Sequence, residues 1–300
     1  MKRVFYTAAI VAALGISVAS CGLNEKKETT QTTDSGTQQT PYEPPAREQI
    51  SYRAVNKKDS IANLSAYDSN QKMIIMALNR MDAAHAAKAD TLIIPDKFID
   101  FNQYSPYPFY VPELKDVKKV IFFSYPAQAF GAYEQGKLVK WGPTNMGRQK
   151  DQTPTGLFFA NWKAEETRST FDDEWLLKWN FNIENKLGVG WHQYEMPGYP
   201  ASHSCLRLLE SDARYLYDWA DQWVLKGTDN VQAKGTPVIV FGSYPFGSGK
   251  PWFAVAQNAK AMDISADQMK ELVATHLQTI LKEQTTQEQF RSTKTADSTK

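Results

Sequence analysis

The chain is poor in cysteine and has almost no net charge. Its 300 residues include two cysteines, Cys21 and Cys205, and 34 basic against 33 acidic side chains give a formal net charge of +1. Two cysteines cannot form a disulfide framework, so we expect the fold to depend on a hydrophobic core, which a chain of this length can build. The near-neutral charge gives no strong field for nucleic acid, and we expect no nucleic-acid partner.

Long apolar runs are also scarce, and one stands at the N-terminus. Residues 4–18 are almost wholly apolar after Met1-Lys2-Arg3, a pattern typical of a secretory signal and too short for a membrane span. The run ends at Val18-Ala19-Ser20-Cys21, which resembles the bacterial lipobox. The resemblance implies cleavage before Cys21 and lipidation of its thiol; the alternative is a plain signal peptide cut near Ala19. We therefore expect a lipoprotein signal peptide over 1–21 and a membrane-anchored lipoprotein of the bacterial cell envelope, facing the periplasm.

Two segments of different character follow the signal peptide. Residues 22–47 have almost no apolar side chains, which predicts a disordered tether. Residues 48–98 show the order strand, helix, helix, strand, with Leu78-Asn79-Arg80 and a final strand stopped by Pro95. This order resembles a LysM module, which implies binding of N-acetylglucosamine-containing glycan. The alternative is a small packing subdomain that binds nothing.

The rest of the chain is predicted to be mainly β, preceded by the small α/β LysM-like module. Apolar runs and alternating patterns predict strands near 120–123, 136–141, 155–159, 177–183, 189–192 and 237–241. One amphipathic helix is expected from an N-cap at Ser211 to Val224. We place a catalytic domain at 117–243. A C-terminal extension over 244–300 is expected to hold a helix at about 265–283 and a disordered tail.

The chemistry of the chain points to Cys205. Once Cys21 is accounted for, Cys205 has no partner in the chain, and it stands beside His203 with Arg207 and His192 close in sequence. Imidazole can accept a thiol proton and positive charge stabilises a thiolate, so this set predicts a nucleophile with either histidine as its base. The alternative is a small buried cysteine. Backbone N–H groups of the loop would hold an oxyanion, and Arg207 a substrate carboxylate. We therefore predict acyl transfer by a cysteine enzyme on a peptide with a free carboxylate.

The residues around Cys205 resemble a known family. Residues 197–208, Pro-Gly-Tyr-Pro-Ala-Ser-His-Ser-Cys-Leu-Arg-Leu, are similar to the signature of the L,D-transpeptidase (YkuD) catalytic domain. The match extends to 152–158 and 212–217, so it covers about 118–243. The resemblance implies a β-rich fold, a peptidoglycan substrate and no metal or organic cofactor. A cysteine would attack a stem tetrapeptide after the L-centre of diaminopimelate, D-alanine would leave, and an amine would take the acyl group.

The resemblance also assigns the site residues. It implies Cys205 as nucleophile, His192 as the upstream histidine of the site and His203 as the histidine of the motif, again an equal candidate for the base. The supporting positions are Ser202, Ser204, Arg207 and Tyr199. The expected partners are the stem peptides and glycan of peptidoglycan, with the membrane reached through the lipid anchor. We expect no zinc site, because one cysteine and two nearby histidines, Cys205, His192 and His203, match no common spacing of zinc ligands.

One departure from the family pattern bears on activity. The family usually has glycine where this chain has Ser204, and serine is strained if the position requires a positive φ.

The polar segment 161–173 is a candidate lid over the site. Three alternatives to transpeptidation stay open. They are hydrolysis of the acyl-enzyme by water, cutting of cross-links or attachment and release of wall proteins, and a non-catalytic wall-binding lipoprotein.

Overall fold

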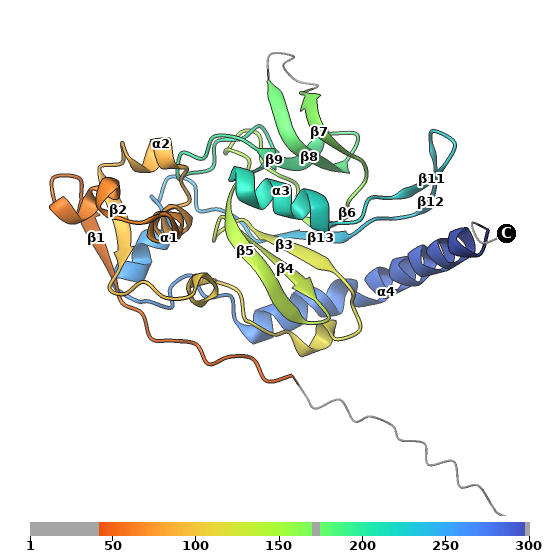
Figure 1. Cartoon of the computed structure of the whole chain (residues 1–300), viewed down its shortest axis with the longest axis horizontal. Helices are drawn as coiled ribbons and strands as arrows, with labels where there is room; N and C mark the ends of the chain where they lie inside the picture. The colour runs from red at the N-terminus through yellow and green to blue at the C-terminus, as the bar shows by residue number, and fades with distance from the viewer. Residues whose placement is uncertain (1–41, 170–174, 298–300) are drawn as a thin grey trace, which may run out of the picture. The chain divides into compact units, whose positions relative to one another are not determined.

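The computed structural model describes residues 42–169 and 175–297 (Figure 1). The predicted signal peptide, the lipidation candidate Cys21 and most of the predicted tether lie outside these residues. Residues 43–300 form one compact unit. The prediction of a mainly β fold is confirmed, because a nine-stranded sheet is the largest element of the unit.

The large sheet mixes parallel and antiparallel pairs and buries both faces. Its strand order is β6-β13-β3-β4-β5-β10-β9-β8-β7. The strands are β3 (Val120–Ser124), β4 (Ala129–Glu134), β5 (Lys137–Asn145), β6 (Gly156–Phe159), β7 (Lys163–Arg168), β8 (Leu176–Glu184), β9 (Val189–Gln193), β10 (Leu206–Leu208) and β13 (Pro237–Phe241). A parallel pair joins β9 to β10, which positions the candidate site.

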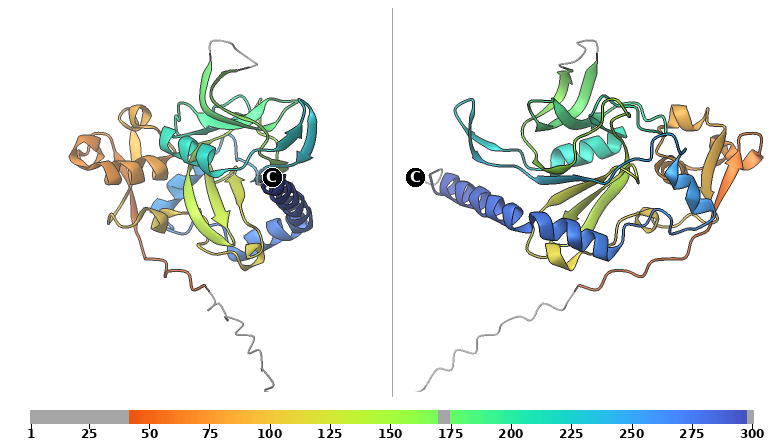
Figure 2. Two further views of the ribbon diagram at one scale, coloured as in Figure 1. Left: turned by 45° about the vertical axis from the view of Figure 1, so that its right-hand side comes forward. Right: turned by 180° about the vertical axis from the view of Figure 1, so that it is seen from behind.

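Two helices cover opposite faces of the sheet. Along β3, Ile121 and Phe123 belong to one core cluster while Val120 and Phe122 belong to another, as expected when successive side chains alternate. Helix α3 (Glu210–Trp219) packs on the first cluster and α4 (Ala266–Asp297) on the second. Figures 1 and 2 show the two helices on either side of β3, β4 and β5.

The N-terminal part forms a small sheet with a helix. Strands β1 (Tyr52–Asn56) and β2 (Thr91–Pro95) pair antiparallel, and α1 (Ser69–Asn79) begins with a capping box between Asp68 and Gln71. The buried Asn79 donates to the Ile93 carbonyl and accepts from the Ile93 N–H, both at 2.8 Å, which fastens α1 to β2. The predicted order is strand, helix, helix and strand; the two strands and α1 are present, and the short 3-10 helices η1 (Ser60–Ala62) and η2 (Leu64–Ala66) stand where the first helix is expected. The likeness to LysM remains a prediction.

This N-terminal part packs firmly on the rest of the unit. Its apolar residues share a core cluster with Trp141 of β5 and Val255. Met81 forms an isolated β-bridge with Pro197, and the Asp82 carboxylate accepts from the Met196 N–H at 2.8 Å. The contact falls just before the loop that carries Cys205.

Shorter elements complete the described fold. They are η1 (Ser60–Ala62), η2 (Leu64–Ala66), α2 (Ala83–Ala86), η3 (Phe101–Tyr104), η4 (Pro112–Leu114), β11 (Val224–Lys226), β12 (Asn230–Ala233) and η5 (Pro251–Ala256).

Three expectations from the sequence are wrong in detail. The N-cap of α3 is Leu209, without a side-chain hydrogen bond, rather than Ser211, and the helix ends at Trp219 because Val224 belongs to β11. Helix α4 does not stop near 283 but continues to Asp297, so the predicted disordered tail is helical to that residue. Residues 163–168 of the candidate lid form the edge strand β7, and 170–173 lie outside the described residues.

Candidate active site

The pairing of β9 with β10 brings Cys205 and His192 to one face of the sheet. Arg207 lies opposite His192 in the parallel register. Side chains alternate along an extended chain, so Cys205, two residues before Arg207, lies on the same face as Arg207. It is therefore displaced by two residues along the chain from the position opposite His192. Cys205, directly before β10, and His192 on β9 are separated by a loop in the sequence but line the same pocket.

A dense set of hydrogen bonds holds the loop that leads to Cys205. The buried Ser202 donates from its N–H to the Met146 carbonyl at 3.2 Å, and its carbonyl accepts from the Arg148 N–H at 3.0 Å. The Ser202 hydroxyl donates to the Cys205 carbonyl at 2.5 Å. Asn145 binds the loop at two further points, the carbonyl of Tyr199 and the N–H of Ala201. These contacts fix the backbone on both sides of the thiol.

Thr153 sets the orientation of the peptide that ends in Cys205. Its hydroxyl donates to the Ser204 carbonyl at 2.8 Å and accepts from the Gly147 N–H at 2.9 Å. The carbonyl and N–H of a trans peptide point in opposite directions, and no peptide bond of the described chain is cis. The Cys205 N–H therefore points away from Thr153.

Ser204 adopts a backbone conformation that favours glycine. Its φ is +77°, so the position is of the type at which the family's usual glycine has no steric penalty. The serine Cβ is strained there by about 1 kcal/mol or more. Its hydroxyl donates to the neighbouring His203 carbonyl.

His192 is buried and presents a lone pair. Its side chain is 3 % exposed, and Nδ1 lies 3.0 Å from the Gln193 carbonyl. A carbonyl only accepts, so we infer that Nδ1 carries the proton and Nε2 is the acceptor. Burial lowers the pKa of His192 to about 4. The ring is therefore neutral at physiological pH.

Cys205 is partly buried and rests as a thiol. Burial raises the pKa of the Cys205 thiol, against smaller opposing effects of the Gly190 N–H and of Arg207. Its Sγ donates weakly to the Gly188 carbonyl at 3.8 Å. The effect of burial on the pKa of this thiol thus outweighs that of the nearby positive charge.

His203 has a different environment from His192. Its ring centroid lies 4.9 Å from that of Trp175, and Nδ1 is buried with no hydrogen-bond partner among the described residues. Burial and the charge of Arg148 lower the pKa of His203, while Asp151 opposes them. No hydrogen bond of the described chain fixes its tautomer.

A small pocket gathers most of the predicted site residues. Its space is about 20 Å³, room for about one water molecule. It is lined by Ser169, Trp175, Leu177, His192, Tyr194, Ser202, His203, Cys205 and Arg207. The Arg207 guanidinium stacks on the Tyr194 ring, with Cζ 4.5 Å from its centroid.

Two predicted supporting residues lie outside this lining. The Tyr199 side chain is 53 % exposed, and the loop uses its carbonyl rather than its ring. Ser204 contributes its backbone to the loop. Conversely, the sequence did not indicate Trp175 or Tyr194, because their approach depends on tertiary packing. Thr153 stands in the motif at 152–158, which could have marked it.

The described part of the chain has neither a cluster of metal ligands nor a membrane-spanning helix. There, no three His, Cys, Asp or Glu side chains are grouped as metal ligands. Nor does any helix of residues 42–169 and 175–297 combine the length and apolarity that crossing a membrane requires.

One comparison with known proteins covers the segment that holds this site. Residues 118–240 match the family model of the L,D-transpeptidase catalytic domain, YkuD. No curated protein sequence gives a significant match.

Similar solved structures include three L,D-transpeptidases. That of Stackebrandtia nassauensis is 24 % identical with a TM-score of 0.35, over 43 % of this chain and 57 % of its own. That of Mycobacterium smegmatis is 22 % identical with a TM-score of 0.34, over 42 % and 59 %. That of Enterococcus faecium is 22 % identical with a TM-score of 0.32, over 41 % and 50 %. The chain thus spans less than two thirds of each of these proteins. By the family match, residues 118–240 are an L,D-transpeptidase catalytic domain of the YkuD family.

Proposed function

We propose that the protein is a peptidoglycan L,D-transpeptidase that works through an acyl-enzyme on Cys205. The observation that carries the proposal is the pair formed by Cys205, which directly precedes β10, and His192 of β9, which line one pocket, with His192 Nε2 inferred to be the proton acceptor. We assign His192 rather than His203 as the base, because the Gln193 carbonyl fixes the required tautomer of His192.

The acylation step uses the backbone of the loop as well as the two side chains. Cys205 Sγ attacks the carbonyl carbon that precedes the terminal D-alanine, and its proton moves to His192 Nε2. The Cys205 N–H stabilises the oxyanion, in the direction set by Thr153. The C–N bond then breaks, and the imidazolium returns its proton to the amine of the leaving D-alanine.

Proton transfer and bond formation occur together in this scheme. Burial raises the pKa of the thiol and lowers that of the imidazole to about 4, so both shifts disfavour a thiolate–imidazolium pair before substrate binds. Formation of the C–S bond removes the cost of a free thiolate. The amine of a second stem peptide then attacks the thioester, His192 takes its proton, and the thiol is restored.

The remaining roles are also proposals. Arg207 would hold a substrate carboxylate at the rim of the pocket, where Tyr194 supports its guanidinium. We further propose that Cys21 carries a lipid anchor in a bacterial envelope, with the protein facing the periplasm, and that the LysM-like part binds glycan.

The test uses residues 43–300 and a purified disaccharide-tetrapeptide, with products analysed by mass spectrometry. Cys205→Ala removes the thiol, and Cys205→Ser keeps a poorer nucleophile of similar size. We expect the unaltered protein to release D-alanine and form a cross-linked dimer, and both variants to form none. Release without a dimer would favour a carboxypeptidase. Absence of any product, with no acyl adduct on Cys205 from a carbapenem, would refute the proposed chemistry.

A further inference from the structure

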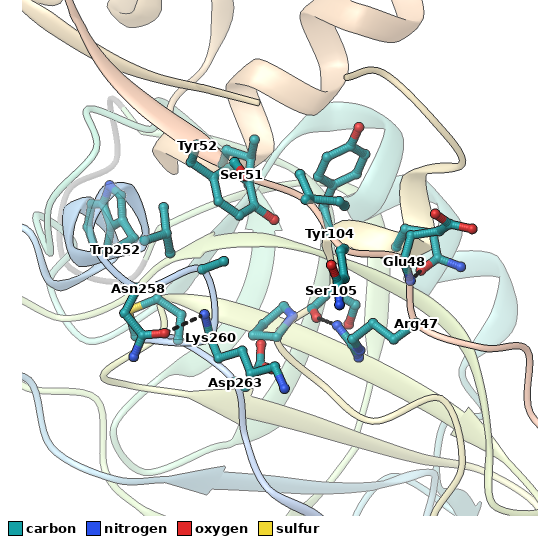
Figure 3. A pocket seen from close by; sticks show the side chains of 18 of the residues that line it. Arg47, Glu48, Ser51, Tyr52, Tyr104, Ser105, Trp252, Asn258, Lys260 and Asp263 are labelled. Atoms are coloured by element: carbon teal, nitrogen blue, oxygen red, sulfur yellow. Dashed lines mark hydrogen bonds between the residues drawn. The ribbon is translucent and has the colours of Figure 1, made fainter. Parts of the chain in front are cut away.

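A second cavity lies between the N-terminal part and the C-terminal extension (Figure 3). Its volume of about 520 Å³ falls in the range of small-molecule sites. It is bordered by Arg47, β1, the end of α1 and residues 252–263, and it shares no lining residue with the pocket of Cys205. The proposed chemistry makes no use of it.

Arg80 is one of the lining residues, a buried arginine without a carboxylate partner among the described residues. Arg80 is the C-cap residue of α1, and only 3 % of its surface is exposed. Nε donates to the Ala127 carbonyl at 2.7 Å, and Nη1 donates to the carbonyls of Ala77 and Leu78. Of the five N–H groups of a guanidinium, the two on Nη2 have no acceptor among the described residues. The C-terminal end of α1 offsets part of the charge, and no ion pair within residues 42–169 and 175–297 neutralises the rest.

A second unpartnered donor lines the same cavity. Trp252 is 1 % exposed, and its indole Nε1 has no hydrogen-bond partner in the described structure. Arg80 Cζ lies 5.6 Å from the centroid of its ring. Buried donors are normally paired, so this buried indole N–H, together with the unbonded Nη2 of Arg80, points to a missing acceptor beside the cavity.

The other walls supply aromatic and charged groups. In Figure 3, Tyr52 and Tyr104 lie on one side of the cavity and Lys260 and Asp263 on the opposite side. Burial raises the pKa of Tyr52 to about 12, so its hydroxyl remains a neutral donor at physiological pH.

The balance of charge selects the kind of ligand. The lining carries Arg47, Arg80 and Lys260 against Glu48 and Asp263, and Glu48 is itself bound by Lys97 at 3.0 Å. A neutral ligand would leave Arg80 uncompensated, and a doubly charged phosphate would be repelled by the acidic residues. A single planar carboxylate matches both the excess charge and the guanidinium edge.

We propose that this cavity is a second binding site, which takes a small molecule by its free carboxylate, with Arg80 as anchor and Tyr52 and Trp252 against the body of the ligand. Two sources of the carboxylate fit its size: an acidic sugar and the C-terminus of a short peptide.

The test compares two acids, each with a neutral analogue, on isotope-labelled residues 43–300. The pairs are N-acetylmuramic acid with N-acetylglucosamine, and acetyl-L-alanyl-D-alanine with its amide. The signal is the indole N–H resonance of Trp252 in the NMR spectrum. We expect at least one acid to shift it and to bind at least tenfold more tightly than its neutral partner, and the responding pair identifies the source. Equal binding of acid and neutral partner, or no binding at about 10 mM, would overturn the proposal.

Variants separate this site from the pocket of Cys205. Arg80→Gln should weaken binding at least tenfold, but Arg80 also supports α1, so Tyr52→Phe and Lys260→Gln serve as milder changes that should each weaken it several-fold. Lys226→Gln, on β11, is the matched control and should bind normally. Binding should persist in Cys205→Ala. Its loss there, or normal binding in all three cavity variants, would contradict the assignment independently of whether the protein is a transpeptidase.

Discussion

The pocket of Cys205 and the cavity of Arg80 differ in nearly every physical respect. The first has about 20 Å³ of space. Its thiol and its His192 ring are neutral, and hydrogen bonds hold the His192 ring and the loop that leads to Cys205. The second has about 520 Å³, three cationic side chains and, among its described lining residues, one buried donor without a partner, Trp252 Nε1. Reactive groups need fixed geometry, whereas a binding site needs room and unsatisfied charge. Cavity volume therefore does not locate the chemistry of this molecule.

The largest effect should come from removing the base in the small pocket. We expect His192→Gln to lower the rate of Cys205 acylation by about 10²- to 10⁴-fold, the usual contribution of a general base. His203→Gln should lower it far less, and His276→Gln on α4 is the matched control. The rate is followed by mass spectrometry of the acyl adduct. A larger loss in His203→Gln than in His192→Gln would reverse the assignment.

Acid should destabilise the small pocket through the same histidine. The unfolded chain takes up a proton on His192 near pH 6.5, whereas the folded chain does so only near pH 4. Stability is therefore lost as pH falls between these values, by up to about 3 kcal/mol. Urea unfolding at several pH values measures this. His192→Gln should flatten the profile by that amount, and an unchanged profile would argue against a buried neutral ring.

A smaller effect should follow from the orientation of the Cys205 N–H. Thr153→Val keeps the shape of the side chain but loses the donor to the Ser204 carbonyl, and we expect about a tenfold slower acylation because the oxyanion site is displaced. Thr153→Ser keeps the hydroxyl and should be nearly normal. Equal rates in the two variants would show that the peptide needs no such support.

The smallest effect should be a gain in stability at Ser204. Glycine tolerates a φ of +77°, so Ser204→Gly should raise the free energy of unfolding by about 1 kcal/mol. Ser204→Ala keeps the Cβ and should give no gain. Urea unfolding of both variants checks this, and a gain in the alanine variant would point to the hydroxyl instead.

The sequence predicted the buried parts of the sheet better than its edge. Apolar runs marked β3 and β13, since both faces of these strands are covered. Edge strand β7, Lys-Ala-Glu-Glu-Thr-Arg, lacks such a run because charged side chains suit an exposed edge, and its polarity alone predicts a lid instead of a strand.

The end of the chain shows a similar limit. Gln284 binds the Lys118 N–H and the Asp116 carbonyl, and Gln287 binds the Lys234 carbonyl. These contacts with distant residues continue α4 where composition alone predicts disorder. In the site, motifs indicated Cys205 and His192, but the roles of Thr153 and Trp175 depend on contacts across the fold.

The contact of Met81 and Asp82 with residues 196 and 197 determines how long a fragment of this protein must be to keep the site intact. The segment recognisable as a family domain starts at residue 118, yet the turn before its Cys205 loop is held by side chains and backbone from more than thirty residues earlier. Excising residues 118–240 would strip that support and uncover Trp141 and its apolar neighbours. The family match covers residues 118–240, but the segment that must fold together to shape the site begins before Met81.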